Sequence, residues 1–383
     1  MQIVIDARLI LNQTTGIGNY LTNLINALLK IDLENHYTLL LDEKLDSNHP
    51  VDLLEQKNLT KRRIKTSAVS LKQHIAIPLQ LWKENANIYH YPHFDLPLLQ
   101  RCNSVITIHD LKYIIAPSFF PEFSISKKLY MSLSIRSSVK RAKKVIVVSE
   151  STKEDLMRLF GVPAPKISVV PLAVGKRFAV SLNKEEIKIK LKKKGIHGKY
   201  FLFVGERRPH KNIVRLIEAF KIFKDRNSEK YQLVIVGKRY SNYTVPEQKI
   251  KELDLESNVI MVGYVPDEEL PLYYQGAEML VFPSMYEGFG IPILEAMACG
   301  IPVITSNISS MPEVAGNAAV LVNPYETNEI AAAMQRICSN RDLRKDLIAK
   351  GSKNVKRFSW EKTAEKTLSV YEEVFLDGTK RKN

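Results

Sequence analysis

The sequence predicts an α/β protein with two domains, each built on a doubly wound parallel β-sheet that carries helices on both faces. Three observations predict this class. The chain has 383 residues, a length that suits two domains of ordinary size. Short apolar runs alternate with amphipathic segments almost throughout, and this alternation occurs in two successive series.

The expected strands are short runs rich in valine and isoleucine, as is typical of strands buried on both faces. The first series comprises residues 3–5, 38–41, 88–91, 105–109, 145–149 and 167–170. The second series comprises residues 201–204, 233–236, 259–262, 279–282, 303–305 and 319–322.

Apolar residues recur at helical spacing between these runs, for example from Ile17 to Leu29 and from Ile213 to Phe223. The change from the first series to the second falls at residues 171–178. We therefore expect an N-terminal domain at 1–172 and a C-terminal domain at 173–358, followed by a last helix at 359–376. The tail at 380–383 is expected to be disordered.

The composition points to a soluble globular protein, with 45% hydrophobic and 25% charged residues. The three cysteines include no CxxC pair, so a disulfide framework or structural zinc is not expected, and a reducing cytoplasm is. No apolar run approaches the roughly 20 residues that a spanning helix needs. Asp6 comes too early for a signal peptide.

Ligands of open parallel sheets bind outside the carboxyl ends of the strands. Four unusual segments directly follow expected strands: residues 15–18, 109–110, 206–212 and 283–290. Each expected domain therefore offers loops at the same kind of edge. If the two edges face each other, the ligand lies in a cleft between the domains.

Two of these segments could bind phosphate. Gly16 and Gly18 would let backbone N–H groups approach an anion at a helix start, although a plain turn explains them equally. Lys211 lies with Arg207 and Arg208 at the start of another expected helix. Three cations oppose the helix dipole there, and a bound diphosphate would offset that cost. A solvated basic loop is the alternative.

The segment that contains Glu287 and Glu295 is the most informative. Pro292 fits the first turn of a short helix, which places Glu295 in that turn or just beyond it and Glu287 in the preceding loop. A carboxylate can accept two hydrogen bonds from the vicinal diol of a ribose or a sugar. Glu295 could equally be a partner of the helix dipole.

His109 ends an expected strand, where it is either a buried structural histidine or part of a site. His109 and Asp110 could supply two metal ligands, but the spacing of the sequence places no third one. No metal site is therefore expected.

Glu287 and Glu295, with seven residues between them, resemble the signature of retaining GT-B glycosyltransferases of family GT4. The likeness extends over nearly the whole chain, through residues 6–8, 16–18, 107–111, 262–271, 296–303 and 312–316. It implies two facing Rossmann-like domains with the donor in the cleft between them. It also implies that the last helix crosses back to the first domain.

The resemblance implies specific roles. Lys211 would hold the donor diphosphate, Glu295 the ribose and Glu287 the transferred sugar, with His109 near the reacting carbon. These enzymes use no metal or cofactor and retain anomeric configuration, with the leaving phosphate as the base. The catalytic residues would be His109, Glu287 and Lys211. The donor-binding residues would be Gly16, Gly18, Arg207, Arg208, Lys211, Lys238, Tyr264, Val265, Glu287, Gly288, Phe289, Gly290, Ile291 and Glu295.

Two positions depart from the family pattern. Many relatives carry an arginine directly after the glycine at position 205, where this chain has Glu206. Arg207 or Arg208 would then supply the second positive charge beside Lys211, and the sequence leaves both open. Asn19 also stands where relatives often have arginine.

The segments at 236–238 and 262–271 look most like the mannosyl-transferring branch that builds O-antigen and similar polysaccharides. GDP-mannose is therefore the expected donor, and a saccharide or lipid-linked saccharide the expected acceptor. The alternatives are a UDP-sugar donor, for glucosyl or N-acetylglucosaminyl transfer, and a non-catalytic sugar-binding protein. The acceptor, the linkage and the oligomeric state are not specified by the sequence.

The formal net charge of +15 implies attraction to an anionic partner. Two stretches contain several cations and no acid, at residues 61–72 and 127–144 of the expected acceptor-side domain. They predict a peripheral position at an anionic membrane, where a lipid-linked acceptor would be met. Nucleic acid is disfavoured, because no array of stacking aromatics accompanies the cations.

Overall fold

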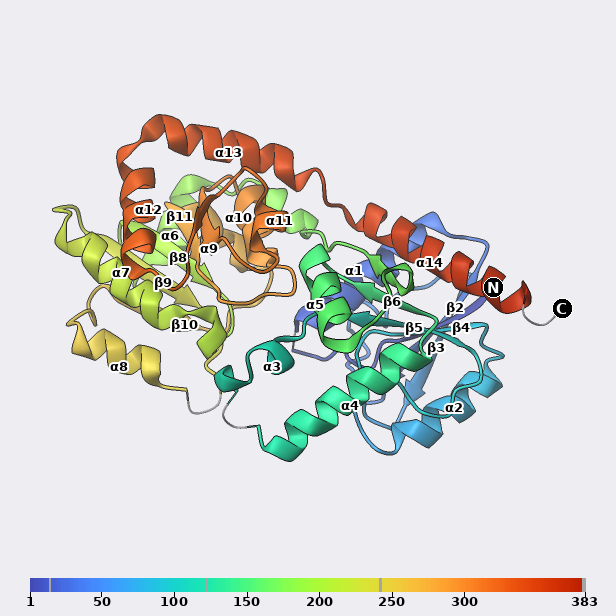
Figure 1. Ribbon diagram of the computed structural model, residues 1–383. Coiled ribbons are helices and arrows are strands. Elements are labelled where there is room, and N and C mark those ends of the chain that lie inside the picture. The colour runs from blue at the N-terminus through green and yellow to red at the C-terminus, as the bar shows by residue number, and fades with distance from the viewer. Residues whose placement is uncertain (14, 121–122, 241–242, 381–383) are drawn as a thin grey trace. The chain divides into compact units, whose positions relative to one another are not determined.

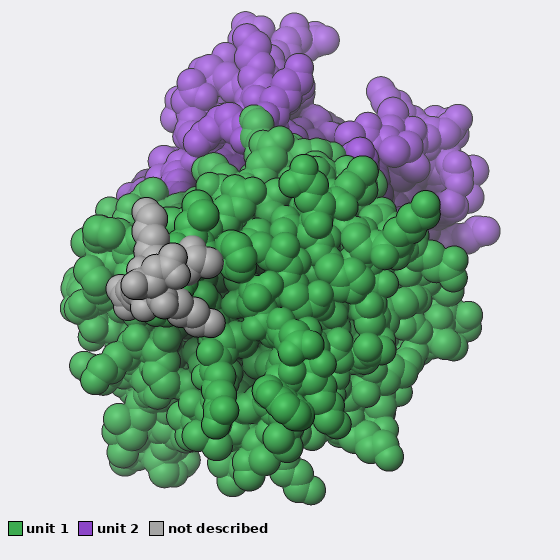
Figure 2. Space-filling view, turned by 90° about the vertical axis from the view of Figure 1, so that its right-hand side faces the viewer, with its two compact units in different colours: residues 1–115, 122–172, 359–383 green, residues 116–121, 173–358 purple. Residues whose placement is uncertain are grey.

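The computed structural model describes residues 1–13, 15–120, 123–240 and 243–380 (Figure 1). Residues 381–383, in the tail for which disorder was expected, lie outside the described residues. The chain forms two compact units (Figure 2). Unit 1 comprises residues 1–115, 122–172 and 359–383, and unit 2 comprises residues 116–121 and 173–358.

Unit 1 contains a seven-stranded sheet in the order β3-β2-β1-β4-β5-β6-β7, and each of its ladders is parallel. Its strands are β1 Gln2–Asp6, β2 His36–Asp42, β3 Leu59–Ile64, β4 Ile88–Tyr91, β5 Asn103–Ile108, β6 Lys144–Val147 and β7 Ile167–Val169. Its helices are α1 Gly16–Ile31, α2 Gln73–Lys83, α3 Lys112–Ile115, α4 Ile125–Arg141, α5 Glu150–Phe160 and α14 Trp360–Lys380.

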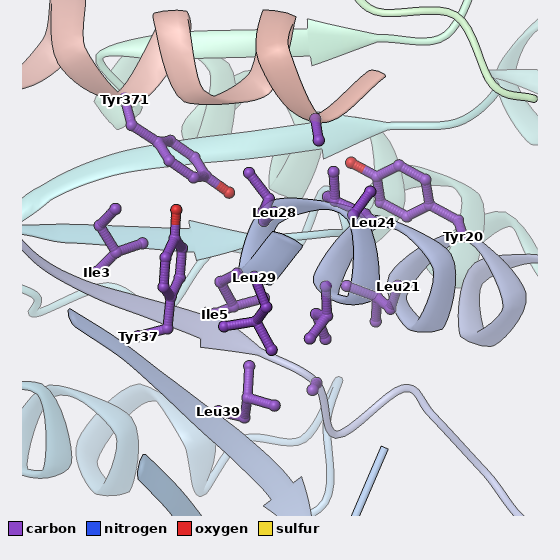
Figure 3. Close-up of a cluster of buried hydrophobic side chains, with 14 of the residues drawn as sticks. Ile3, Ile5, Tyr20, Leu21, Leu24, Leu28, Leu29, Tyr37, Leu39 and Tyr371 are labelled. Carbon is purple, nitrogen blue, oxygen red and sulfur yellow. The ribbon is translucent and has the colours of Figure 1, made fainter. Parts of the chain in front are cut away.

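The two faces of this sheet carry separate cores. Ile3 and Ile5 of β1 pack with Leu24 and Leu28 of α1 and with Tyr371 of α14 (Figure 3). Val4, between them, points to the other face, because successive side chains of a strand alternate. There it joins a cluster that contains Ile77 and Leu81 of α2 and Ile135 and Val139 of α4.

Strand β3 was not expected. Its residues Lys61, Arg62 and Arg63 were interpreted as part of a basic stretch, but they form an edge strand paired only with β2 among the described strands. An edge strand needs no apolar alternation on its outer side, and its charges discourage pairing with another chain. Arg62 binds Glu84 at 2.8 Å and Arg63 donates to the carbonyl of Leu45 at 2.7 Å.

Unit 2 contains a six-stranded sheet in the order β10-β9-β8-β11-β12-β13, again parallel in each ladder. Its strands are β8 Lys199–Val204, β9 Tyr231–Val236, β10 Val259–Gly263, β11 Met279–Phe282, β12 Val303–Ser306 and β13 Val320–Val322. Its helices are α6 Lys184–Lys192, α7 Ile213–Asp225, α8 Val245–Glu252, α9 Leu270–Gly276, α10 Ile291–Ala298, α11 Met311–Ala315, α12 Thr327–Ser339 and α13 Arg341–Val355. The predicted class of two parallel, Rossmann-like domains is confirmed.

The last helix, α14, belongs to unit 1 although it follows unit 2 in the sequence. It packs against α1, and Thr363 at its start donates to the carbonyl of Pro171 at 2.8 Å. Tyr371 Oη lies 2.6 Å from His90 Nδ1 of β4. The helix runs to Lys380, beyond residue 376 where the apolar periodicity ends.

Candidate functional site

Lys211 and Glu287 meet at the carboxyl edge of the sheet of unit 2. Lys211 follows β8 and Glu287 follows β11, and these two strands are neighbours. Lys211 Nζ donates to Glu287 Oε1 at 2.6 Å, and the side chains are 15% and 13% exposed. The ion pair joins two groups for which separate roles were expected, one toward phosphate and one toward sugar.

The loop at 283–290 is fixed from the β8 side by Asn212. Its Nδ2 donates to the carbonyls of Pro283 at 3.0 Å and Pro324 at 2.6 Å. Asn212 has a φ of 61°, a left-handed conformation that asparagine tolerates better than most residues. The N–H of Met285 donates to the carbonyl of His210 at 2.8 Å. These bonds hold the loop of Glu287 against the loop of Lys211.

Two serines after β12 fix the same loop from the other side. Ser309 Oγ donates to the carbonyl of Glu287 at 2.7 Å, and Ser310 Oγ donates to the carbonyl of Phe289 at 2.8 Å. Gly288 lies between these two anchors. The backbone around Glu287 is thus held in place by its neighbours, which pre-organises this loop for a ligand.

Gly290 and Pro292 start α10 as the sequence indicates. Gly290 has a φ of 100°, which favours glycine, and Ile291 is the first helical residue with Pro292 beside it in the first turn. Glu295 is the fifth residue of this helix and is only 7% exposed. A glutamate that only stabilises a helix dipole can remain exposed to solvent. The burial of Glu295 therefore goes beyond what that interaction requires.

The carboxyl group of Glu295 accepts a hydrogen bond from Tyr274 Oη of α9 at 2.6 Å. Burial raises the pKa of Glu295 to about 7, and this effect exceeds the opposing effect of the Tyr274 hydrogen bond. Asp267 raises the pKa of Glu295 further. Near neutral pH the group therefore exchanges between its charged and its protonated form.

The two arginines near Lys211 are held by different acids. Arg207 Nη1 binds Glu247 of α8 at 2.9 Å. Arg208 Nε binds Glu206 at 2.6 Å, and its guanidinium lies 3.4 Å from the ring centroid of Tyr240. The carbonyl of Arg208 also accepts from the N–H of Lys211 at 3.0 Å. Arg208 thus shares a turn with Lys211, whereas Arg207 binds α8.

Three glycines lie side by side at the carboxyl ends of β8, β9 and β10, where Gly205 and Gly237 follow their strands and Gly263 is the last residue of its own. The N–H of Gly205 donates to Val236, and the N–H of Gly237 donates to the carbonyl of Gly263 at 2.7 Å. A Cβ atom on Gly237 would lie 1.9 Å from the carbonyl oxygen of Gly205, so this position admits only glycine. Gly237 thus allows the two backbones to approach closely, and a Cβ atom on Gly263 would meet nothing within 4 Å. We call the backbone of these three glycines the glycine floor.

The other predicted donor residues of unit 2 border that floor. Lys238 follows Gly237 and is exposed, and its carbonyl accepts from the N–H of Arg207 at 2.9 Å. Tyr264 follows β10 and is half exposed, whereas Val265 is buried. Both lie at the end of the β10 ladder, at the same sheet edge as Lys211.

In unit 1, Gly16 is the first residue of α1 and Gly18 lies in its first turn. The side chain of Thr15 caps this helix by accepting from the N–H of Gly18 at 3.0 Å. A Cβ atom on Gly18 would lie 3.0 Å from that Thr15 oxygen and 3.4 Å from the carbonyl of Leu9. Gly18 therefore allows a close approach, while Gly16 borders open space.

His109 follows β5 at the carboxyl edge of the sheet of unit 1. Burial lowers its pKa to about 4, so the ring is neutral at pH 7. Its Nε2 has no hydrogen-bond partner among the described residues. A neutral ring with an unused nitrogen at this edge can exchange a hydrogen bond with a ligand.

Several residues that hold the candidate site were not predicted: Asn212, Tyr274, Ser309, Ser310 and Tyr20, whose ring contacts that of His109. Ser309 and Ser310 follow a predicted strand, so the strand-end rule could have identified them. Tyr274 lies inside a helix, where no sequence rule marks it as the partner of Glu295.

Comparison with known proteins defines the class. The model of the family "Glycosyl transferases group 1" matches residues 183–354, and the model of "Glycosyltransferase Family 4" matches residues 14–175. The chain belongs to this family and is a glycosyltransferase.

Three relatives of this chain are named as mannosyltransferases. O-antigen chain mannosyltransferase B of Escherichia coli is 34% identical over 285 residues, which are 74% of this chain and 74% of the relative. O-antigen chain mannosyltransferase RfbU of Salmonella typhimurium is 35% identical over 64% of this chain and 63% of its own length. Serotype-specific mannosyltransferase WbdA of Escherichia coli is 28% identical over 69% of this chain, and the match spans only 32% of that relative.

Solved structures share the fold. A sucrose-phosphate synthase from Thermosynechococcus elongatus has a TM-score of 0.77 and 22% identity over 98% of this chain and 99% of its own. Anabaena HepE, solved in complex with UDP and glucose, has a TM-score of 0.76 and 18% identity over 97% of this chain and 100% of its own.

Membrane-spanning helices and metal-binding clusters are both absent from the described part of the chain. None of its helices combines the length and the apolar character needed to cross a membrane. Nor does that part hold a group of three or more His, Cys, Asp or Glu residues placed to bind a metal ion.

Proposed function

We propose that this glycosyltransferase moves mannose from GDP-mannose to a saccharide or lipid-linked saccharide, with retention of configuration, in the synthesis of a surface polysaccharide. The ion pair between Lys211 and Glu287 is the observation that carries the proposed site. The choice of mannose is supported by the relatives, because three of them are named as mannosyltransferases.

The donor diphosphate would replace Glu287 as the partner of Lys211. Glu287 would then turn to the hydroxyl groups of the sugar, with the N–H groups of Phe289 and Gly290 beside it. The pairing supports this exchange, because Glu287 Oε1 occupies the place beside Lys211 Nζ, at 2.6 Å, that a phosphate oxygen would take. Gly288 and Ile291 would complete the wall around the sugar.

The leaving diphosphate gains negative charge as the bond to the sugar carbon breaks. We assign its neutralisation to Lys211 and Arg208, which share one turn. The acceptor oxygen would attack the same face of the sugar, and its proton would pass to the departing phosphate oxygen. No nucleophile from the protein and no metal enters this scheme.

The nucleoside would lie over the glycine floor. Glu295 would accept hydrogen bonds from the ribose diol, and Tyr264, Val265 and Lys238 would border the base. The floor supports this placement, because the missing side chain of Gly263 leaves open space beside the backbone.

We further propose that the expected N-terminal domain, residues 1–172 with the returning helix, lies on the acceptor side and that residues 173–358 bind the donor. His109, Gly16 and Gly18 would then act on the same donor across a cleft. The unused Nε2 of His109 supports this role.

A peripheral position at the inner face of a membrane is part of the proposal. Lys127, Lys128, Arg136 and Lys140 on α4 are mostly exposed and support it. The first basic stretch supports it less, because Lys61, Arg62 and Arg63 bind neighbouring groups of unit 1. Co-sedimentation with liposomes should increase with anionic lipid, and indifference to lipid charge would contradict the proposal.

Donor hydrolysis without acceptor, measured over a panel of nucleotide sugars, tests the reaction. GDP-mannose should be hydrolysed and should raise the melting temperature more than UDP-glucose or UDP-N-acetylglucosamine. Preference for a UDP-sugar would show that the donor is not GDP-mannose. Binding without hydrolysis or transfer would favour a sugar-binding protein. Chelation by EDTA should leave the rate unchanged.

A further inference from the structure

Helix α2 presents a row of large apolar side chains to solvent. Leu71, two residues before the helix starts, and Ile75, Leu79 and Trp82 within it are exposed, and Trp82 is 72% exposed. Their spacing of three and four residues places them on one face of the helix. The opposite face, with Ile77 and Leu81, already packs in the core, so the exposed row does not serve the packing of this unit.

A groove of about 730 Å³ lies beside this row, within unit 1. It is lined by Ile75, Leu79 and Trp82 of α2, by Leu99 and by Phe375 of α14. This volume is typical of small-molecule sites, and apolar lining suits a hydrocarbon. Arg101 also lines it, and none of its described lining residues is acidic.

The groove lies far from the candidate donor site. Asn87 and Asn103, which line it, stand at the amino ends of β4 and β5. His109 follows the carboxyl end of β5. Because β5 has six residues, His109 lies about 20 Å from Asn103 at the other end of the strand. A molecule in the groove is therefore not the sugar that reacts beside His109.

The charge around the groove selects the partner. Residues 56–149, which include α2, the loop of Leu99 and α4, have sixteen lysines and arginines against four acids. One of these acids, Asp95, is buried, and another, Glu84, binds Arg62. Helix α14 adds Glu372, Glu373 and Asp377 near Phe375, and Glu373 binds Lys144 at 2.6 Å, so cations remain in excess. Arg141 of α4 donates to the carbonyls of Leu96 and Pro97 at 2.7 and 2.6 Å, so the loop of Leu99 is tied to the basic helix.

We propose that this groove holds one hydrocarbon chain of an anionic membrane phospholipid, with the phosphate of the lipid at Arg101. The apolar row of α2 would lie among the acyl chains, and the cations would meet the headgroups. The proposal goes beyond the transfer reaction, because the lipid would anchor the enzyme and would not be its acceptor. It rests on the membrane position proposed above and assigns a surface to it.

Trp82 gives a direct test, because the chain has two tryptophans and Trp360→Phe leaves only Trp82. This variant is mixed with phosphatidylglycerol vesicles whose acyl chains carry bromine. We expect the Trp82 emission to shift to shorter wavelength and to be quenched. Unchanged emission while the protein sediments with the vesicles would overturn the proposal, since binding would then use another surface.

Substitutions test the groove itself. Arg101→Ala should weaken partition to these vesicles about fivefold, the effect of one cation at an anionic surface. Ile75→Asp should abolish the emission shift, whereas Ile189→Asp on α6 of unit 2 should not. The two isoleucines are matched, at 64% and 57% exposed. Equal partition of Ile75→Asp and Ile189→Asp would refute the groove.

Two further readouts separate this proposal from others. Ile75→Asp should keep the rate of donor hydrolysis without vesicles, so failure of the transferase proposal and failure of the lipid proposal are distinguishable. Sedimentation equilibrium should show the same mass for Ile75→Asp and the unmodified chain. A dimer that this substitution dissociates would assign the groove to a second copy and overturn the lipid proposal.

Discussion

The ring of Tyr20 lies edge-on to His109, with ring centroids 4.7 Å apart and an interplanar angle of 78°. Tyr20 Oη lies 3.2 Å from Thr107 Oγ1, which in turn lies 2.7 Å from His90 Nε2. His90 contacts Tyr371 of α14. The imidazole of His109 is therefore held by a buried chain of side chains that extends to the last helix.

The first prediction concerns this contact. Tyr20→Leu removes the aromatic edge and should lower kcat on the order of tenfold, because a small displacement of His109 misplaces it at the sugar. Tyr20→Phe keeps the ring and should retain most of the turnover. Kinetics, with the imidazole NMR signals of His109 as a positional readout, check this. Equal losses in both variants would assign the effect to the hydroxyl group instead.

The second prediction concerns Lys211 and Glu287. Glu287→Ala should remove transfer, and Lys211→Ala should weaken GDP binding. Each should lower the free energy of unfolding by about 1–3 kcal/mol, because it leaves a mostly buried charge unpaired. The double variant should lose less than the sum of the two.

Chemical denaturation measures this cycle, and Lys350 and Asp346 on α13 provide the control. That pair has the same separation, 2.6 Å, but its side chains are 40% and 49% exposed. Its removal should cost about 0.5 kcal/mol or less. Additive losses for Lys211 and Glu287 would show that they are not coupled.

The third prediction concerns Glu295. Because its pKa is raised from 4.5 to about 7, the folded protein binds more protons there than the unfolded chain between these pH values. Stability is therefore lost as the pH rises through this window, by up to about 3 kcal/mol. Glu295→Gln should raise the melting temperature at pH 8 and not at pH 4.5, whereas Glu365→Gln at an exposed position should do neither.

The same group should make donor binding depend on pH. The ionised carboxylate accepts two hydrogen bonds from a diol, so GDP affinity should rise as the pH increases through 7. Glu295→Gln should bind GDP more weakly and lose this dependence. Calorimetric titration across the window measures both effects, and a flat profile for the unmodified enzyme would exclude Glu295 from the ribose site.

The fourth prediction separates the two arginines. Arg208→Ala should lower GDP affinity about tenfold, the loss of a charge-assisted hydrogen bond to phosphate. Arg207→Ala should change GDP affinity little and lower the melting temperature, because it leaves Glu247 without its partner on α8. If Arg207→Ala lowered GDP affinity more than Arg208→Ala, Arg207 would be the arginine that binds the diphosphate.

Much of the fold could be predicted from hydrophobic runs. Each of the twelve predicted strand segments overlaps an observed strand, because burial on both faces leaves a clear apolar pattern. Strand β3 left no such pattern, since an edge strand tolerates Lys61, Arg62 and Arg63. Its formation depends on the exposed edge of β2, which a local sequence window does not contain.

The sequence indicated where in the chain the candidate site residues lie, but not which of them are in contact. The strand-end rule indicated the segments of Lys211 and Glu287, but their ion pair depends on β8 lying beside β11, across a crossover in the chain. The raised pKa of Glu295 depends on burial against Tyr274, which belongs to another helix. Such relationships arise from tertiary packing and have no local signal.

The return of α14 to unit 1 has a consequence for synthesis of the chain. Residues 173–358 are complete before Tyr371 and the rest of α14 leave the ribosome. Until then Leu24 and Leu28 of α1 lack the helix that covers them. Unit 2 can therefore fold while unit 1 still waits for its last helix. A nascent chain stalled before Trp360 should contain a native unit 2 and a unit 1 that chaperones still recognise.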